Sequence, residues 1–240
     1  VVGVLHQSFR QYAARLGIES RDEWAKIQGR YADIPLVAAS DEVVELIGRA
    51  VETNVRPQSN RVDAKTIAIS IATRRPAIGV NTFADSLDAC WPLHPTMAAL
   101  LGSVSRRQFG QNERSTFGFL GSVEPHGFRS FLQEQELTDE CRYRPDHYWE
   151  YLRVNLEPAI LSSPDGHRWA QAVDAVERTE AHHSPLHSTL IKSIAVIDLL
   201  RNASGLAAEA EVLRSLFPSK LAEDIDSALV QLSKLSLIHI

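Results

Sequence analysis

Apolar residues follow two different patterns along this chain. The first five residues, Val1–Leu5, form a continuous apolar run, which is typical of a strand buried on both faces of a parallel sheet. Further extended pieces are expected at Tyr31–Val37, where Pro35 suits a strand end, and at Leu235–Ile240. From Asp41 onward most apolar residues recur at helical spacing. The pattern therefore predicts a mainly α-helical chain with strands near its two ends.

The helical spacing predicts a succession of amphipathic helices between these ends. A loop is expected between Pro76 and Cys90, and a strong turn at Ser162–Gly166. The helices are expected at residues 43–51, at Val62–Ala72, as a pair within Phe128–Asn155, and at Trp169–Ala181, Leu190–Leu200, Ala207–Phe217 and Leu221–Leu235.

The stretch Trp91–Leu120 is predicted to form two short helices separated by a basic, glycine-containing elbow. Pro95 suits the first position of a helix, because its missing N–H would have no partner there. One apolar face of this first helix is expected from Met97, Leu100, Leu101 and Val104. The second helix is expected to carry Phe117 and Leu120 on one side and to end at Gly121.

The elbow contains a candidate anion site. Arg107 lies within it, Asn112 is a suitable cap for the second helix, and Arg114 falls in the first turn of that helix. A helix dipole favours anions at this end, so a cation there is unusual. One interpretation is that Arg114 and free N–H groups meet a phosphate. The other is a surface arginine paired with Glu113 or Glu124.

Composition excludes some classes of partner. The chain has 240 residues, a hydrophobic content of 44% and a net charge of −5, so its overall charge favours neither nucleic acid nor an anionic membrane. No apolar run approaches the roughly 20 residues that span a bilayer. The two cysteines, Cys90 and Cys141, show no metal spacing and are expected to be buried in a protein of the reducing cytoplasm.

The order of the elements resembles the C-terminal part of an AAA+ or STAND-type P-loop ATPase. In these proteins a strand with a polar end is followed by a segment similar to Gly29–Pro35, then by a helical lid and often by a winged helix. Gln111–Leu120 resembles the sensor-2 helix of the lid. The pair His94–Pro95, followed by Leu100–Leu101 and this stretch, also resembles large bacterial ATP-binding proteins, some with an implied role in phage defence.

The resemblance implies roles for individual residues. His6 or Gln7 would be the sensor-1 group that orients water, and Arg30 would be an arginine finger acting across a subunit boundary. Arg114, with Arg107 and Asn112, would contact the nucleotide from the lid. The implied ligands are ATP and Mg²⁺, and the implied partners are other subunits of a homo-oligomer or partner proteins.

One departure from the family pattern is large. The chain contains no G-x-x-x-x-G-K-[ST] motif and no strand that ends in paired acidic residues, so it lacks both the phosphate cradle and the Mg²⁺ ligands. We therefore expect a fragment of a longer protein, with both motifs upstream of Val1. Its expected parts are the end of an ATPase core at 1–37, a helical lid at 38–121, a helical connector at 122–188 and a truncated winged helix at 189–240.

Three alternative functions stay open at this point. A winged-helix DNA-binding regulator is disfavoured by charge, because Leu190–Ile240 holds five basic and six acidic residues, a net charge of −1. A helical protein-interaction module would need only the amphipathic helices. A zinc site is conceivable at Glu180, His182, His183 and His187, although Pro185 interrupts any helix that would present them together.

Overall fold

The structure is a computed structural model of the chain. It describes residues 17–31, 39–53, 56–104, 116–136, 138, 141–182, 184–218 and 220–234. The chain divides into two compact units, Val1–Val37 and Ala38–Ile240. In the first unit the described element is α2 (Ile18–Gln28), none of whose residues is buried. The predicted strands lie outside the described residues, except for Tyr31, which forms a bend.

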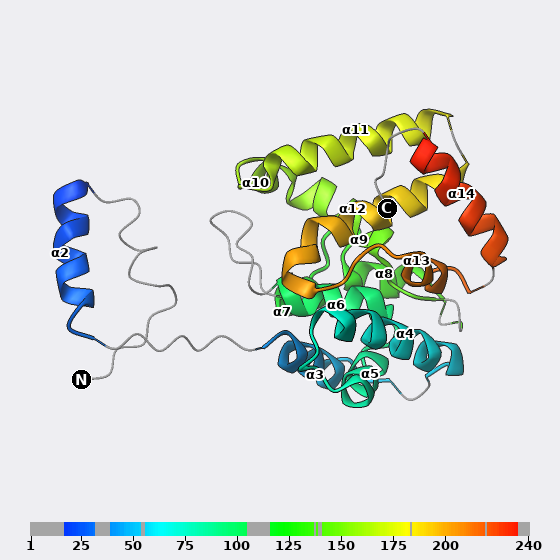
Figure 1. Ribbon diagram of the computed structural model, residues 1–240, viewed down its shortest axis with the longest axis horizontal. Coiled ribbons are helices and arrows are strands. Elements are labelled where there is room, and N and C mark those ends of the chain that lie inside the picture. The colour runs from blue at the N-terminus through cyan, green and yellow to red at the C-terminus, as the bar shows by residue number, and fades with distance from the viewer. Residues whose placement is uncertain are drawn as a thin grey trace. The chain divides into compact units, whose positions relative to one another are not determined.

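The described part of the second unit is built from helices (Figure 1). These are α3 (Ser40–Ala50), α4 (Gln58–Arg74), α5 (Val80–Asp88), α6 (Pro95–Val104), α7 (Thr116–Gly121), α8 (Phe128–Glu134), α9 (Pro145–Asn155), α10 (Glu157–Leu161), α11 (Gly166–His182), α12 (Pro185–Ser204), α13 (Ala210–Ser215) and α14 (Ala222–Lys234). Among the described residues, β-type pairing is limited to one isolated parallel bridge between Leu93 and Tyr143. The prediction of a mainly α-helical chain is confirmed.

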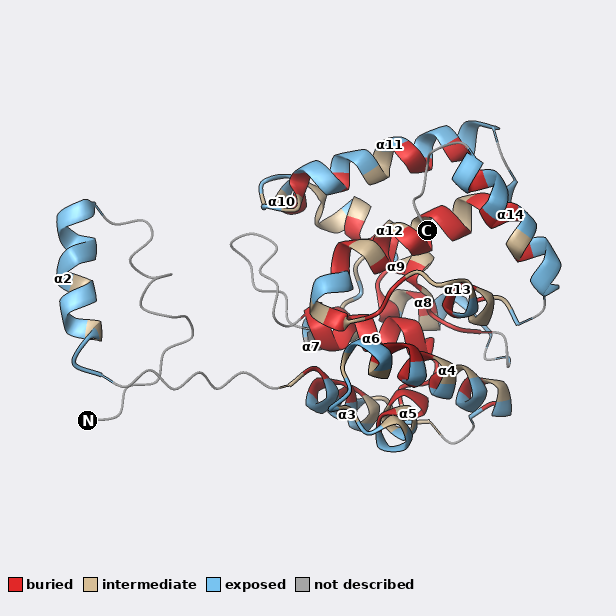
Figure 2. Ribbon diagram, in the orientation of Figure 1, coloured by how far each residue is buried: buried red, intermediate tan, exposed pale blue. Residues whose placement is uncertain are grey.

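Helix α6 forms the centre of the second unit. All ten of its residues are buried, and it contacts α3, α4 and α5 on one side and α12 on the other (Figure 2). The prediction of a single apolar face was therefore wrong: Ala98, Ala99 and Gly102 are small enough to let neighbouring helices close around the whole helix. Helices α9, α11 and α14 then pack against α12.

The region between Pro76 and Cys90, which was predicted to be a loop, is partly helical. This region contains α5, whose residues Val80, Phe83, Ala84 and Leu87 pack against the core. Their spacing of i, i+3, i+4 and i+7 is the helical pattern that the prediction overlooked.

Other local predictions agree with the structure. Cys90 and Cys141 are buried, and the tyrosines of α9 pack in the core with Trp149. Helix α12 contains the predicted helix Leu190–Leu200 but is longer at both ends, from Pro185 to Ser204. It is followed by Gly205, whose φ of 76° is the left-handed conformation that glycine adopts without strain. None of the helices in the described ranges combines the length and apolar character needed to cross a bilayer.

Candidate functional site

The structure describes one of the six residues predicted to act on nucleotide. Arg30 follows α2, and its backbone N–H donates to the carbonyl oxygen of Ile27 at 3.0 Å, which closes the last turn. Its side chain is exposed and forms no ion pair with another described residue. The other five predicted site residues lie outside the described residues: His6, Gln7, Arg107, Asn112 and Arg114.

The segment 105–115, which carries three of these residues, connects two helices that are fixed in the core. On its N-terminal side, Val104 ends the fully buried helix α6. On its C-terminal side, Phe119 of α7 is 3% exposed and packs edge-on against three tyrosine rings. The distances between ring centroids are 5.5 Å to Tyr143, 5.1 Å to Tyr148 and 4.9 Å to Tyr151. Edge-to-face contacts of this kind favour one arrangement of the rings, so they hold Phe119 of α7 against the core.

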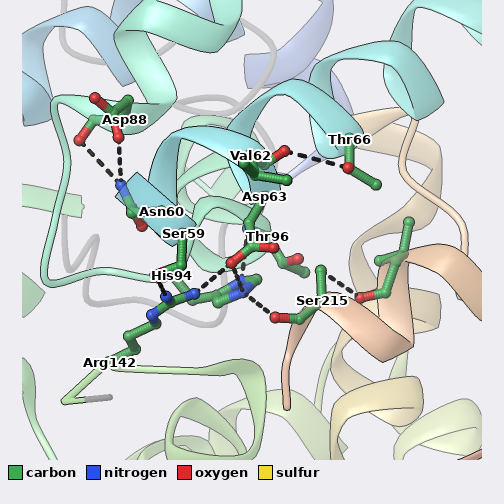
Figure 3. A network of polar contacts seen from close by, with 11 residues as sticks. Ser59, Asn60, Val62, Asp63, Thr66, Asp88, His94, Thr96, Arg142 and Ser215 are labelled. Carbon is green, nitrogen blue, oxygen red and sulfur yellow. Dashed lines mark hydrogen bonds and ion pairs between the residues drawn. The ribbon is translucent and has the colours of Figure 1, made fainter. Parts of the chain in front are cut away.

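Between α4, α6 and α13 lies a buried polar network that the sequence analysis did not identify (Figure 3). His94, immediately before α6, is completely buried. Its Nδ1 accepts a hydrogen bond from the backbone N–H of Thr96 at 3.1 Å, so its Nε2 carries the proton and donates to the carbonyl oxygen of Ser215 at 3.0 Å. Burial, helped by the nearby Arg142 guanidinium, lowers the pKa of His94 to about 3. The imidazole is therefore neutral at physiological pH.

An ion pair lies beside this histidine. Arg142 forms a salt bridge with Asp63 of α4 and donates from Nη2 to Ser59 Oγ at 2.6 Å. The Asp63 Oδ2 lies 4.0 Å from His94 Nε2. Burial raises the pKa of Asp63, and the hydrogen bond and charge of Arg142 act in the opposite direction. The pair thus ties α4 to the segment that precedes α9.

The His94 and Arg142 side chains of this network hold helices together. Both nitrogens of His94 are engaged, and Arg142 is 3% exposed. A general base needs a free lone pair within reach of the proton that it abstracts, which His94 lacks. The sequence did hold a signal for this network, because His94 is the one ionisable residue in the otherwise uncharged stretch Trp91–Val104.

The candidate zinc ligands have other partners. Glu180 accepts from Lys192 at 2.6 Å, and His187 contacts Ser184 Oγ and Gln231 Oε1 at 2.8 and 2.9 Å. The expected interruption at Pro185 is confirmed, because α11 ends at His182 and α12 begins at Pro185. No group of three His, Cys, Asp or Glu side chains that could hold a metal ion occurs among the residues that the structure describes. His183 is not among them.

The C-terminal part contains three helices, α12, α13 and α14, close to the predicted positions. Arg214 of α13 makes a bidentate contact with Asp226 of α14, at 2.9 and 2.8 Å. Glu223 and Asp224 are exposed in the first turn of α14. A helix that reads DNA presents donors and cations to the groove, so this acidic start does not favour nucleic acid as the partner of α14.

Comparison with protein families finds no match, and comparisons with curated proteins and with solved structures find none either.

Proposed function

We propose that this chain is the C-terminal part of an ATP-dependent switch protein of the AAA+ or STAND type. Its second unit would supply the helical lid, and α12 to α14 would belong to a truncated winged helix that relays the nucleotide state. Arg114, with Arg107 and Asn112, would sense the nucleotide from the lid. His6 or Gln7 would act at the end of a core strand, and Arg30 would reach a neighbouring subunit.

The observation that best supports this proposal is the burial of Val104 and Phe119, two core residues on either side of segment 105–115 in the sequence. A sensor must keep its cation at a fixed place while the ligand changes, because misplacement by about 1 Å weakens phosphoryl-transfer catalysis strongly. Arg107 and Arg114 lie between these two residues in the sequence, which fits a role as sensors on a segment bounded by core helices. The exposed guanidinium of Arg30 is also consistent with a group that acts across a subunit boundary.

The described residues do not by themselves form a site for ATP and Mg²⁺. They include one of the six proposed contact residues and no carboxylate cluster suited to a metal ion. The phosphate cradle and Mg²⁺ ligands would belong to the longer, cytoplasmic and oligomeric protein that we propose.

The decisive experiment uses the intact protein. The reading frame upstream of Val1 should encode a Walker A lysine, and its absence would refute the ATPase proposal. In the full-length protein, Arg114→Ala should lower ATP turnover at least tenfold, because a γ-phosphate cation is lost. The matched control is Arg61→Ala, which removes an exposed arginine of α4 and should leave turnover unchanged. Equal turnover in both variants would assign Arg114 to the surface.

A helical protein-interaction module is the second candidate. It is favoured by the contacts of His94 and Arg142, because both side chains are used to join helices to one another. This candidate predicts that no property of the intact protein depends on nucleotide.

A further inference from the structure

A cavity of about 250 Å³ lies between α11 and α12, which run side by side (Figure 1). It exists because small side chains face each other where the two helices pack. Ala172 and Ala175 come from α11, and Ala195 comes from α12. Ligand cavities in proteins are typically about 300–1,000 Å³, so this one suits a small molecule of one ring and a short chain.

The lining of the cavity combines apolar side chains with three polar ones, which are Arg168, Gln171 and Asp198. Trp169, Ile191, Ile194 and Leu199 line it and are themselves buried. The Trp169 ring stacks on Trp149 with a centroid distance of 4.4 Å, and its Nε1 donates to a carboxylate oxygen of Glu157 at 2.9 Å. These contacts fix the plane of the Trp169 indole, so the cavity has a preformed flat surface for the apolar part of a ligand.

A carboxyl group lies in the same lining without a partner. The Asp198 side chain is partly buried and has no hydrogen bond or ion pair with another described residue. The neighbouring cation is engaged elsewhere, since Arg168 donates from Nη2 to the main-chain oxygen of Asp198 at 2.7 Å and lies 3.6 Å from the Asp165 carboxylate. A partly buried carboxylate of this kind is stabilised by a cation that brings its own hydrogen-bond donors.

We propose that the cavity between α11 and α12 binds a small organic amine with an aromatic or branched aliphatic body. The ammonium group would pair with Asp198, and the body would lie against Trp169 and the isoleucines of α12. Burial raises the pKa of Asp198, which fits a group that has lost part of its hydration and gains from an ammonium partner. The charges of Arg201 and Arg168 oppose this shift.

The test compares three probes with similar bodies and different charge: 2-phenylethylamine, 2-phenylethanol and 3-phenylpropanoate. Binding to the whole chain at pH 7 is followed by saturation-transfer NMR and by tryptophan fluorescence, since Trp169 lines the cavity. The amine should bind about tenfold more tightly than the alcohol, and the carboxylate most weakly, because a charge-assisted hydrogen bond exceeds a neutral one by about 1–2 kcal/mol.

Two variants separate the charge from the cavity. Asp198→Asn should bring the affinity for the amine down to that for the alcohol. Ala195→Leu should fill the space and abolish binding of all three probes, with Ala172→Leu as the substitute should the first fail to fold. The controls are Asp174→Asn and Ala181→Leu, which alter exposed residues of α11 outside the cavity and should bind as the wild type does.

Three results would each overturn the proposal. The first is no binding of the amine at millimolar concentration by a folded chain. The second is tightest binding of the carboxylate, which would indicate Arg168 as the recognising group. The third is an unchanged ratio of amine to alcohol affinity in Asp198→Asn.

Discussion

The imidazole Nε2 of His94 donates a hydrogen bond to the carbonyl oxygen of Ser215 at 3.0 Å, although 121 residues separate them. His94 immediately precedes α6, and Ser215 ends α13. Since α6 leads into segment 105–115, one buried bond connects the start of the predicted lid helix with the predicted C-terminal module. A change in the position of either helix would break this bond and leave a buried polar group without a partner.

The unfolding free energy should depend on pH through His94. Its pKa is about 3 in the folded chain and near 6.5 when unfolded, so the unfolded chain binds the extra proton first as the pH falls. Neutral His94 makes its full contribution to the free energy of unfolding above pH 6.5. This contribution falls progressively as the pH is lowered to about 3. Between pH 7 and pH 5 the loss from this residue should be about 2 kcal/mol, measured by urea denaturation.

The matched variant for this experiment is His94→Gln. Glutamine does not titrate, and its amide N–H can replace the donor to Ser215. The variant should be less stable at pH 7, but it should lose about 2 kcal/mol less than the wild type between pH 7 and pH 5. If the free energy of unfolding fell by the same amount in both proteins between pH 7 and pH 5, His94 would not be buried in the neutral form.

The two arginine–aspartate pairs of α4 should differ in their effect on stability. The side chains of Arg142 and Asp63 are 2% and 14% exposed, whereas those of Arg61 and Asp85 are 66% and 67% exposed. Arg142→Ala leaves a mostly buried carboxylate unpaired and should cost about 3–5 kcal/mol. Arg61→Ala should cost at most about 1 kcal/mol, because water solvates both groups of the exposed pair.

Chemical denaturation of both variants measures this difference directly. The double variant Asp63→Asn, Arg142→Met should recover part of the lost stability, because it removes the charge that Arg142→Ala leaves unpaired. Equal losses for Arg142→Ala and Arg61→Ala would contradict the buried network.

Gly102 should not tolerate a larger side chain. A Cβ atom there would lie 2.6 Å from the carbonyl oxygen of Ser40 and 2.8 Å from Val44 Cγ2, both in α3. Gly102→Ala should therefore force α3 and α6 apart and lower the melting temperature, at a cost of about 1–3 kcal/mol. Gly121→Ala is the control, because a Cβ there has no neighbour within 4 Å and the change should stay within about 0.5 kcal/mol.

The helices were predictable where local signals agreed. Pro95 and Pro185 each begin a helix, and Gly205 terminates one, as the rules for helix ends require. Helix α5 was missed although Phe83 and Leu87 carry its apolar face. The structure therefore confirms a helical chain, while the strands, the P-loop core and the winged helix stay predictions.

The polar network could not be predicted, because its contacts join distant residues. The sequence places Asp63, His94 and Arg142 far apart. The packing of α4 against α6 and the bridge between Leu93 and Tyr143 bring them together. Local propensity carries no information about such contacts, whose energy depends on burial. The cavity at Asp198 was missed for the same reason, since it depends on how α11 and α12 meet.

The pH dependence of amine binding gives an independent check on Asp198. Binding needs the carboxylate, and burial raises the pKa of this group, so affinity should begin to fall at a higher pH than for an exposed aspartate. The charges that act on Asp198 are those of Arg168 and Arg201, and the Asp165 carboxylate lies 3.6 Å from Arg168. Calorimetric titration of 2-phenylethylamine between pH 7 and pH 4 should show progressively weaker binding. Asp198→Asn should bind weakly at every pH, and a pH-dependent loss that persists in this variant would place the ammonium on another carboxylate.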